Sequence, residues 1–553
     1  MRALSDELRQ LADDYWQAIL DEEPTERHML GDYSDVRSYE EASREAQERY
    51  AATLRDFAKR AEAVQTAALD PEEVLTRGVI ISSAAAHADL LDTLLGCRNA
   101  DSVHGLQGTL PLLMGLLAVT DQTVADAMPA KLDAVGTHFR QLADRTREGV
   151  SAGWVSPEFA VSQTIEQIEK ALAVPLADDP VVAAVQLPEG VDADAVRGAL
   201  REAVERSLRP GLEDYREALT DALPHARSEG ECGLSWLPGG SGAYDAALRY
   251  FTTTEKTAQE IHDIGLTQVA KLADEYRALG PEVVGTDDLE QIFAAMRTDP
   301  ELHFEHGHEM VEQSKVALAR AEAAMADWFE VVPQAPCAVQ GTEVGAKAFY
   351  FPPATDGSRG GTFFINTDDA SSWGRFELEA MAFHEGVPGH HLQLAIASEL
   401  PDTMPEFRKH LHSAAYAEGW GLYTERLSDE MGLYSAAVDR MGMYSADSLR
   451  ACRLVVDTGI HALGWSRQQA IDYMVANSPL TDGVCRPEVD RYICTPGQAT
   501  SYMIGRLEIQ RMRAEAEQRQ GDRFDVKKFH SAVLESGSLP LDVLDQVVAA
   551  RLA

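Results

Sequence analysis

The chain has 553 residues, which allows a large core and more than one lobe, and its 45% apolar and 25% charged content is ordinary for a globular protein. Its 90 acidic and 49 basic residues give a net charge of −41, which argues against partners such as nucleic acid or an anionic membrane surface. We interpret the acidic excess as a solvated exterior, with steering of cationic substrates as the alternative.

Cysteine usage and the N-terminal text together predict a cytoplasmic protein. The six cysteines are scattered and form no CxxC pair, so we expect free, mostly buried thiols in a reducing compartment. Cys485 and Cys494 are close enough in sequence to pair, but nothing requires it. The opening text MRALSDELRQLADDYW is charged and amphipathic, unlike a signal peptide. We find no window of about 18 apolar residues and therefore expect no transmembrane span.

The first part of the chain reads as helices. Residues 1–65 have helical periodicity, and strands are hard to find before residue 220. Further helices are predicted at 73–97, 105–128, 130–150, 156–173 and 190–222. A Gly-rich stretch at 223–245 has no such periodicity and predicts the passage between lobes. We therefore divide the chain into an N-terminal helical lobe, 1–225, and a catalytic lobe, 226–553.

The second part begins with helices and then changes to strands. A helix is predicted at 257–279, with Thr257 as N-cap and Glu260 three residues later, followed by helices at 286–297 and 299–328. Between 330 and 367, the segments FEVVP, AKAFYFPPA and GGTFFINT predict a hairpin or small sheet with a turn at 355–359. A helix starts near Arg375, and helical text continues almost to the end, with breaks at 477–480 and 495–497. The predicted fold is mainly α with a small β-sheet, in two lobes around a central cleft.

The helix after the predicted sheet carries the most informative motif, HEGVPGHH. Zinc hydrolases commonly use HExxH, in which two histidines one helical turn apart bind the metal and the glutamate acts as base. His384 and Glu385 begin such a motif, but position 388 is proline. The next histidines, His390 and His391, would both be badly placed on an unbroken helix.

The residues between the histidines suggest how the spacing is accommodated. Gly386-Val387-Pro388-Gly389 is a poor helix interior, because proline removes a backbone donor and glycine permits unusual dihedral angles. We expect a break that brings His390 to the position of the second ligand. His391 is the alternative ligand, or a group that contacts a ligand or substrate.

A third ligand is needed, and Glu418 is the candidate. It lies in apolar helical text, AEGWGLYTE, where an unpaired carboxylate would be costly to bury. Its alternative role is an ion pair with an Arg or Lys. Glu425 is two turns further along, and we expect it to face solvent or to support a ligand.

Residues in other segments could complete a peptidase site. His461, with Asp457 fixing its tautomer, or Tyr502 could donate to an oxyanion, although an internal ion-pair network would also explain the first pair. The strand at 360–367 is predicted to align an extended peptide by main-chain hydrogen bonds. Arg491 or Arg506 could hold a substrate carboxylate, which would favour peptide C-termini. The candidate substrate-binding residues are Gly361, Phe363, Asn366, Arg491, Tyr492 and Arg506.

The segments HEGVPGHHLQ and YAEGWGLYTERL resemble the bacterial domain-of-unknown-function 885 family, which is grouped with zincin-like metallopeptidases. The second segment is also similar to the one that supplies the zinc-binding glutamate in gluzincin aminopeptidases. The resemblance covers most of residues 225–550 and, more loosely, the N-terminal helices. It implies one Zn²⁺ ion, ligands His384, His390 and Glu418, and Glu385 as base.

These observations predict a zinc metallopeptidase that hydrolyses short peptides, as a monomer or homodimer. Metal-activated water would be the nucleophile, with Glu385 as general base. Two alternatives use the same residues. One is a metal-dependent hydrolase of a non-peptide amide, and the other is a non-catalytic binding protein stabilised by the metal. The presence of Glu385 counts against the second, because a structural site needs no base.

Overall fold

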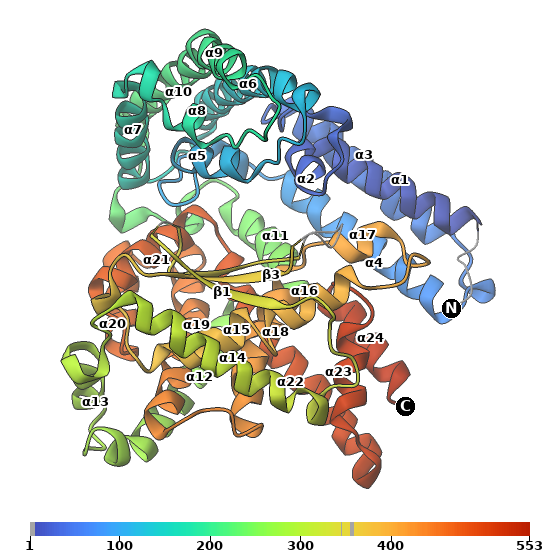
Figure 1. Cartoon of the computed structure of the whole chain (residues 1–553), viewed down its shortest axis with the longest axis vertical. Helices are drawn as coiled ribbons and strands as arrows, with labels where there is room; N and C mark the ends of the chain where they lie inside the picture. Colours follow the sequence, from blue (N-terminus) through green and yellow to red (C-terminus); the bar gives the residue numbers. More distant parts are fainter. Residues whose placement is uncertain (1–5, 344, 354–358) are drawn as a thin grey trace.

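The structure, a computed structural model, describes residues 6–343, 345–353 and 359–553. It is mainly helical with a three-stranded sheet, which confirms the predicted fold class at that level. Figure 1 shows one group of helices at the top and a larger helical body below it. The strands run across the upper side of that body.

Described residues 6–222 form ten α-helices, some joined by short 3₁₀ turns. Their bounds are α1 (Asp6–Glu22), α2 (Pro24–Met29), α3 (Arg44–Ala63), α4 (Pro71–Leu91), α5 (Leu106–Leu116), α6 (Gln122–Ala152), α7 (Glu158–Ala173), α8 (Pro180–Ala184), α9 (Ala193–Ala203) and α10 (Arg209–Ala222). The break predicted near residue 129 lies instead at 117–121, because the Asp121 carboxylate caps α6 by accepting from the Val124 N–H. Pro129 is accommodated inside α6.

The second part contains the helices before and after the sheet in the chain, of which α14, α15 and α16 contact the sheet. Their bounds are α11 (Gly240–Thr252), α12 (Ala258–Val283), α13 (Leu289–Thr298), α14 (Gly307–Trp328), α15 (Glu377–Glu385), α16 (His390–Ser398), α17 (Glu406–His410), α18 (Ala414–Glu430), α19 (Ala437–His461), α20 (Arg467–Asn477), α21 (Asp482–Cys494), α22 (Ser501–Gln520), α23 (Val526–Leu534) and α24 (Leu541–Arg551). The capping box predicted at Thr257 and Glu260 is present at the start of α12.

The sheet consists of β1 (Cys337–Thr342), β2 (Ala348–Phe351) and β3 (Gly361–Asn366) in the order β1-β3-β2. β3 pairs in parallel with β1 and antiparallel with β2, so it is the central strand. The segment 329–333, FEVVP, was expected to be a strand and is not one; β1 begins four residues later. Residues 355–358 of the predicted turn lie outside the described residues.

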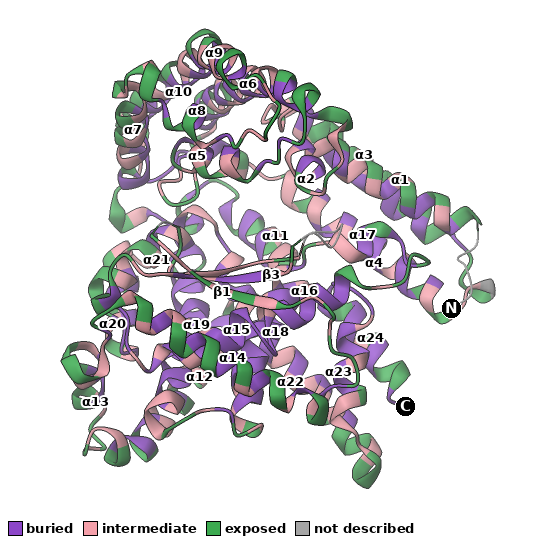
Figure 2. Cartoon of the chain, in the orientation of Figure 1, coloured by how far each residue is buried: buried purple, intermediate pink, exposed green. Residues whose placement is uncertain are grey.

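Three buried clusters of apolar side chains form the core. The largest joins α1, α3 and α4 to helices of the second part, so apolar residues on both sides of residue 225 share it. A second cluster lies mainly within α5–α10 and their loops but also includes Val36, and a third lies mainly around α19–α21. Figure 2 shows that buried residues are concentrated on α15, α18 and α19, which are the helices that surround the candidate site.

Helix α4 corrects the expectation that no stretch of the chain is long and apolar enough to cross a membrane. Its 21 residues are long and apolar enough, by hydropathy alone, to cross a membrane. In the structure α4 packs against α3, α11 and α24, and its Val79 and Ile80 side chains are fully buried. Of the apolar window, 39% is buried inside the structure, so packing against neighbouring helices explains part of the apolar text of α4.

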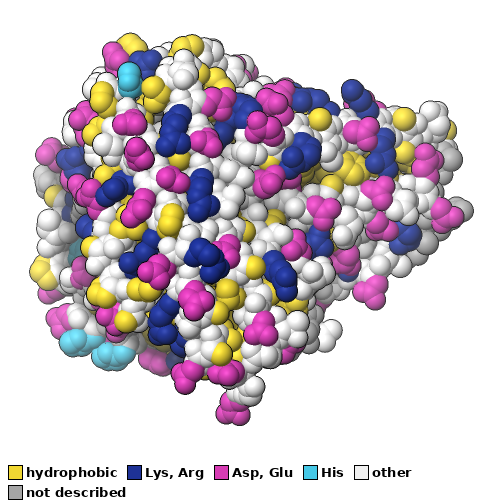
Figure 3. All heavy atoms as spheres, turned by 90° about the horizontal axis from the view of Figure 1, so that it is seen from above, with side chains coloured by type: hydrophobic (Ala, Val, Ile, Leu, Met, Phe, Trp, Pro, Cys, Tyr) yellow, Lys and Arg dark blue, Asp and Glu magenta, His cyan; other side chains and the backbone are white. Residues whose placement is uncertain are grey.

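One further feature matches an expectation from the sequence, namely that the cysteines are free and mostly buried. All six cysteines are free thiols, four of them buried. On the face drawn in Figure 3, Lys and Arg side chains alternate with Asp and Glu, and no continuous basic surface is seen there.

Candidate metal centre

The helix that carries the histidines is broken where the sequence predicted. α15 ends at Glu385 and α16 begins at His390, with a cis bond between Val387 and Pro388. A Cβ atom at position 389 would lie 2.0 Å from the carbonyl oxygen of His384, so only glycine fits this turn. The break lets the rings of His384 and His390 meet at a centroid distance of 4.7 Å.

Helix α18 supplies the other side of the cluster. Glu418, Gly421 and Glu425 follow each other at i, i+3 and i+7, so they share one face of this helix. A Cβ at Gly421 would lie 2.7 Å from Cε1 of His384, which shows that the imidazole lies directly against the α18 backbone. The indole N–H of Trp420 donates to the carbonyl oxygen of Pro388 at 3.0 Å and ties α18 to the helix break.

Three donor atoms converge at this point. Nε2 of His384 is 3.5 Å and Nε2 of His390 is 3.6 Å from Oε2 of Glu418. One ligand atom from each of the three residues lies within 4.8 Å of the other two. Ligands about 2.0–2.1 Å from a tetrahedral zinc ion are about 3.3 Å apart, close to these separations. Within the described ranges this is the one His/Cys/Asp/Glu cluster that could hold a metal ion.

The surroundings of His384 fix its orientation. Its Nδ1 bonds to Oε1 of Glu425 at 2.8 Å, and Arg450 lies 3.7 Å from the same oxygen. Glu425 is 1% exposed, so the expectation that it either faces solvent or supports a ligand resolves to the second. This His–carboxylate contact is typical of histidines that bind a metal through the other ring nitrogen.

The cluster favours positive charge at its centre. Burial acts to lower the pKa of His384, but the carboxylates of Glu418 and Glu425 outweigh it and raise that pKa to about 9. Burial likewise acts to raise the pKa of Glu418, and the two histidines hold it well below its ordinary value. Glu418 and His390 keep 20% and 13% of their side-chain surface exposed, so the cluster is open to solvent on one side.

The two adjacent histidines have different surroundings. Nδ1 of His391 accepts from the hydroxyl of Tyr350 at 2.8 Å, and its Nε2 donates to the carbonyl of Ala335 at 3.0 Å. Both nitrogens of His391 are thus occupied away from Glu418. Nδ1 of His390 is buried without a hydrogen-bond partner in the described part of the chain, while its Nε2 faces Glu418.

Glu385 and Tyr502 lie beside the three donors. Glu385 is 8% exposed, and no hydrogen bond or ion pair of its carboxylate is found among the described residues, so the carboxylate is uncommitted. Tyr502 comes from α22, which crosses α18 with backbone contact between Gly419 and Gly505. Burial and then the nearby Glu418 carboxylate raise the pKa of Tyr502, which keeps its hydroxyl protonated.

His461 cannot donate a hydrogen bond to an oxyanion, the role predicted for it, because both of its ring nitrogens already have partners. Its Nδ1 accepts from the backbone N–H of Leu234, and its Nε2 donates to the carbonyl of Tyr492. Asp457 does not fix this tautomer; its carboxylate accepts from Tyr244 and from the Gly497 N–H. Burial lowers the pKa of His461 to about 3, so the ring is a neutral interior group with both nitrogens occupied.

The predicted strand residues also have structural roles. Because β3 is paired on both sides, its main chain cannot add a substrate strand, and the free edges belong to β1 and β2. Gly361 lies against Tyr350 and His391, where no Cβ would fit, and Phe363 is fully buried. The side-chain amide of Asn366 donates to the carbonyl of Gly345.

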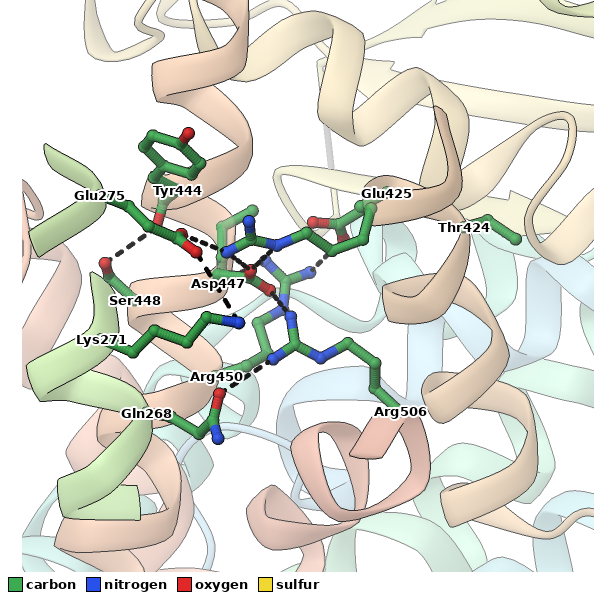
Figure 4. A network of polar contacts seen from close by, with 12 residues as sticks. Gln268, Lys271, Glu275, Thr424, Glu425, Tyr444, Asp447, Ser448, Arg450 and Arg506 are labelled. Atoms are coloured by element: carbon green, nitrogen blue, oxygen red, sulfur yellow. Dashed lines mark hydrogen bonds and ion pairs between the residues drawn. The ribbon is translucent and has the colours of Figure 1, made fainter. Parts of the chain in front are cut away.

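The downstream arginines have different partners. Arg506 forms an ion pair with Asp447, a fully buried carboxylate that also binds Arg426, and lies in the polar network of Figure 4. Arg506 therefore belongs to a buried ion-pair network and does not bind a substrate carboxylate as predicted. Tyr492 is fully buried and bonds to Arg453 and Glu488, whereas Arg491 stays partly exposed and contacts Glu488 and Gln498.

One residue near the cluster escaped the sequence analysis. His412 lies in the loop before α18. Burial lowers the pKa of His412; the Glu418 carboxylate acts against this shift, and His390 acts with it. Its place six residues before Glu418 is the only signal that the sequence contains. A lone loop histidine has many structural explanations, so that signal was too weak to select it.

Comparison with known proteins places this geometry in a family. Residues 24–548 match the family described as "Bacterial protein of unknown function (DUF885)". No curated protein matches the chain. A crystal structure of "the putative lipoprotein from Colwellia psychrerythraea" has a similar fold, with a TM-score of 0.91, 24% identity and coverage of 99% of this chain and 98% of that one. "A putative lipoprotein of unknown function from Shewanella oneidensis" matches with a TM-score of 0.77, 17% identity and coverage of 98% and 99%.

Proposed function

The chain belongs to the DUF885 family of bacterial proteins of unknown function, and within that family we propose that it is a zinc-dependent metallopeptidase acting on short peptides. The observation that carries the proposal is the convergence of His384, His390 and Glu418 beside an uncommitted Glu385. A purely structural metal site is usually closed by four protein ligands, whereas a catalytic site has three and an open position.

The donor set fits zinc. Two imidazole nitrogens and one carboxylate oxygen suit this ion, and His384 is oriented by Glu425 as a ligand requires. A zinc ion held there would supply Lewis acidity toward a carbonyl and toward water. The arrangement of a His-Glu helix completed by a glutamate on the next long helix supports a gluzincin type of zincin-like site.

The protein's own side chains can perform the proton transfers. Glu385 is next to His384 in sequence and has no other partner among the described residues, so it can accept a proton from the attacking water and return it to the leaving amine. Tyr502 remains a protonated donor at neutral pH and can stabilise charge that develops on the carbonyl oxygen. His461, Arg506 and the β3 residues are not part of this proposal.

A second candidate function uses the same atoms. A metal-dependent hydrolase of a non-peptide amide needs the same base and ligands, and only the substrate pocket would differ. One observation favours this second function. β3 has no free edge, so it cannot bind an extended peptide substrate by main-chain hydrogen bonds as the sequence had suggested. A metal-stabilised binding protein is disfavoured by the free Glu385 carboxylate.

The compartment is also a proposal. Six free thiols are typical of a reducing environment and favour the cytoplasm. The two structural neighbours are described as lipoproteins, which favours the cell envelope. Cell fractionation with an antibody against this chain would distinguish the two.

The decisive test of the function compares wild type with Glu385→Gln after zinc loading. We expect equal zinc content in both proteins and a loss of at least about 100-fold in hydrolysis of a mixed short-peptide library, because a general base contributes about 10²–10⁴-fold. Metal content is measured by elemental analysis and cleavage by mass spectrometry. Undiminished cleavage by Glu385→Gln would rule out the mechanism, and a wild type without bound metal would rule out the function.

A further inference from the structure

Two guanidinium groups near the cluster share a single carboxylate. Nη2 of Arg453, on α19, is 2.8 Å from Oε2 of Glu488, and Nη2 of Arg491, on α21, is 3.1 Å from the same oxygen. The Tyr492 hydroxyl donates to that oxygen as well. Asp457, the other carboxylate near Arg491, is bonded to Tyr244 and to the backbone of residue 497 instead. Among the described residues, the two guanidinium groups of Arg453 and Arg491 therefore share Glu488 as the one carboxylate to which both are bonded.

One hydrogen-bond donor of this pair is unsatisfied. Arg453 is 6% exposed, and its Nη1 is buried without a hydrogen-bond partner in the part of the chain that is described. A buried, charged N–H group without an acceptor is energetically unfavourable, because it has lost its hydrogen bonds to water. An anionic ligand would remove this cost, and a carboxylate matches the planar geometry of a guanidinium.

The arginine pair is connected to the metal cluster through Tyr502. The guanidinium of Arg453 lies 4.3 Å from the centroid of the Tyr502 ring. Tyr502 is one turn before Gly505, where α22 touches α18 at Ala415 and Gly419, the residues that flank the turn of Glu418. Besides burial, the charges of Glu418, Arg453 and Arg491 all act on the pKa of Tyr502, so this residue lies near both the arginine pair and the metal cluster.

We propose that Arg453 and Arg491 form a subsite for a substrate carboxylate, so that this protein acts on peptides with a free carboxylate near the scissile bond. The inference rests on the proposed function and specifies its substrate class. Two sources share the chemistry, namely the C-terminal carboxylate and an Asp or Glu side chain. Arg506 is excluded from the subsite because it pairs with Asp447, whose side chain is fully buried.

The first experiment compares three forms of one short peptide with zinc-loaded full-length protein. The forms are the free acid, the C-terminal amide, and an amide whose last residue is Asp. We expect kcat/KM to fall at least about 10-fold from the acid to the plain amide, the loss of one charged hydrogen bond. Recovery with the Asp peptide would identify a side-chain carboxylate as sufficient, and no recovery would identify the C-terminus. Equal cleavage of all three forms would overturn the inference.

A binding measurement separates failure of the subsite from failure of the proposed function. Calorimetry of zinc-loaded Glu385→Gln with the acid and the plain amide tests recognition without turnover. Tighter binding of the acid supports the subsite even if wild type cleaves neither peptide, a result that would count only against the peptidase. Equal affinities overturn the subsite even if both peptides are cleaved.

Variants at Arg491 test the residue itself. Arg453 is buried and its replacement threatens folding, so Arg491 is changed and Arg486→Ala, an exposed position on the same helix, is the control. Arg491→Ala should keep zinc and reduce the acid-to-amide preference by about 10-fold, Arg491→Lys should restore part of it, and Arg486→Ala should leave it unchanged. An Arg491→Ala protein that binds zinc and keeps the full preference would contradict the inference.

Discussion

At the scale of single residues, the chemistry of the candidate site depends on which atom already has a partner. His384 presents Nε2 because Glu425 occupies Nδ1, whereas His391 presents neither nitrogen because Tyr350 and Ala335 occupy both. Sequence spacing could not choose between His390 and His391. The contacts of His391 with β2 and with the loop before β1, far away in the chain, favour His390 as the proposed ligand.

Glu425 provides a prediction at this scale. We expect Glu425→Gln to lower zinc affinity about 10–100-fold, because the amide is a weaker acceptor for the His384 N–H and leaves that ligand less basic. Affinity is measured by competition with a chromophoric chelator. The control is Glu430→Gln on the same helix, where the side chain is 47% exposed and pairs with Arg513. Equal affinity in the two variants would contradict this role for Glu425.

His461 provides a pH prediction. Its pKa is lowered by burial to about 3 in the folded protein, against 6.5 ordinarily, so between these values the unfolded chain binds a proton that the folded one does not. The stability contributed by neutral His461 is therefore present above pH 6.5 and is lost as the pH falls. The difference in unfolding free energy between wild type and His461→Gln should shrink by about 2 kcal/mol from pH 7 to pH 5, measured by urea denaturation. A difference that does not change with pH would argue against a neutral buried ring.

At the scale of elements, the crossing of α18 and α22 positions Glu418 relative to Tyr502. A Cβ at Gly505 would lie 1.9 Å from the carbonyl oxygen of Ala415 and 2.7 Å from the Cα of Gly419. Gly419 and Gly505 allow the backbones of α18 and α22 to touch at the crossing. This contact explains why a glycine stands inside each of the two helices. The break between α15 and α16 plays the corresponding role for the histidines.

The crossing predicts that Gly505→Ala is destabilising. The added methyl group meets backbone atoms that cannot move aside, so we expect a loss of about 1–3 kcal/mol in unfolding free energy, together with weaker zinc binding. Gly198→Ala is the matched control, because a Cβ there meets nothing within 4 Å and alanine should stabilise helix α9 by about 0.5–1 kcal/mol. Thermal melts of the two variants should move in opposite directions.

At the scale of the whole molecule, the candidate site joins parts of the fold that are distant in sequence. The network in Figure 4 connects α12, α18, α19 and α22 through Arg426, Asp447 and Arg506. Arg450, on the same helix α19 as Asp447, contacts Glu425, which in turn bonds to His384. Buried ion pairs of this kind contribute little net stability, but removing one partner leaves an uncompensated charge. The site is therefore coupled to the integrity of the larger core.

Metal removal should consequently affect the stability of the entire chain. A ligand that binds only the folded state stabilises it by about 4 kcal/mol at 1,000 times its Kd, so a chelator should lower the melting temperature and zinc should restore it. We expect this zinc-dependent shift to be absent in His390→Ala and present in His391→Ala, as measured by differential scanning calorimetry. The reverse pattern would make His391 the ligand.

The sequence by itself determined the features that depend on local physics. Helical periodicity predicted the mainly α fold, glycine and proline predicted the break at 386–389, and an acidic residue in apolar text identified Glu418. Tertiary structure decided what depends on partners from other segments. β1 and β2 pair with the two edges of β3, Asp447 pairs with Arg506, and backbone groups of Leu234 and Tyr492 occupy both ring nitrogens of His461. The physical reason is that a side chain's chemistry depends on which neighbour satisfies its hydrogen bonds and charge, and those neighbours are set by packing rather than by sequence spacing.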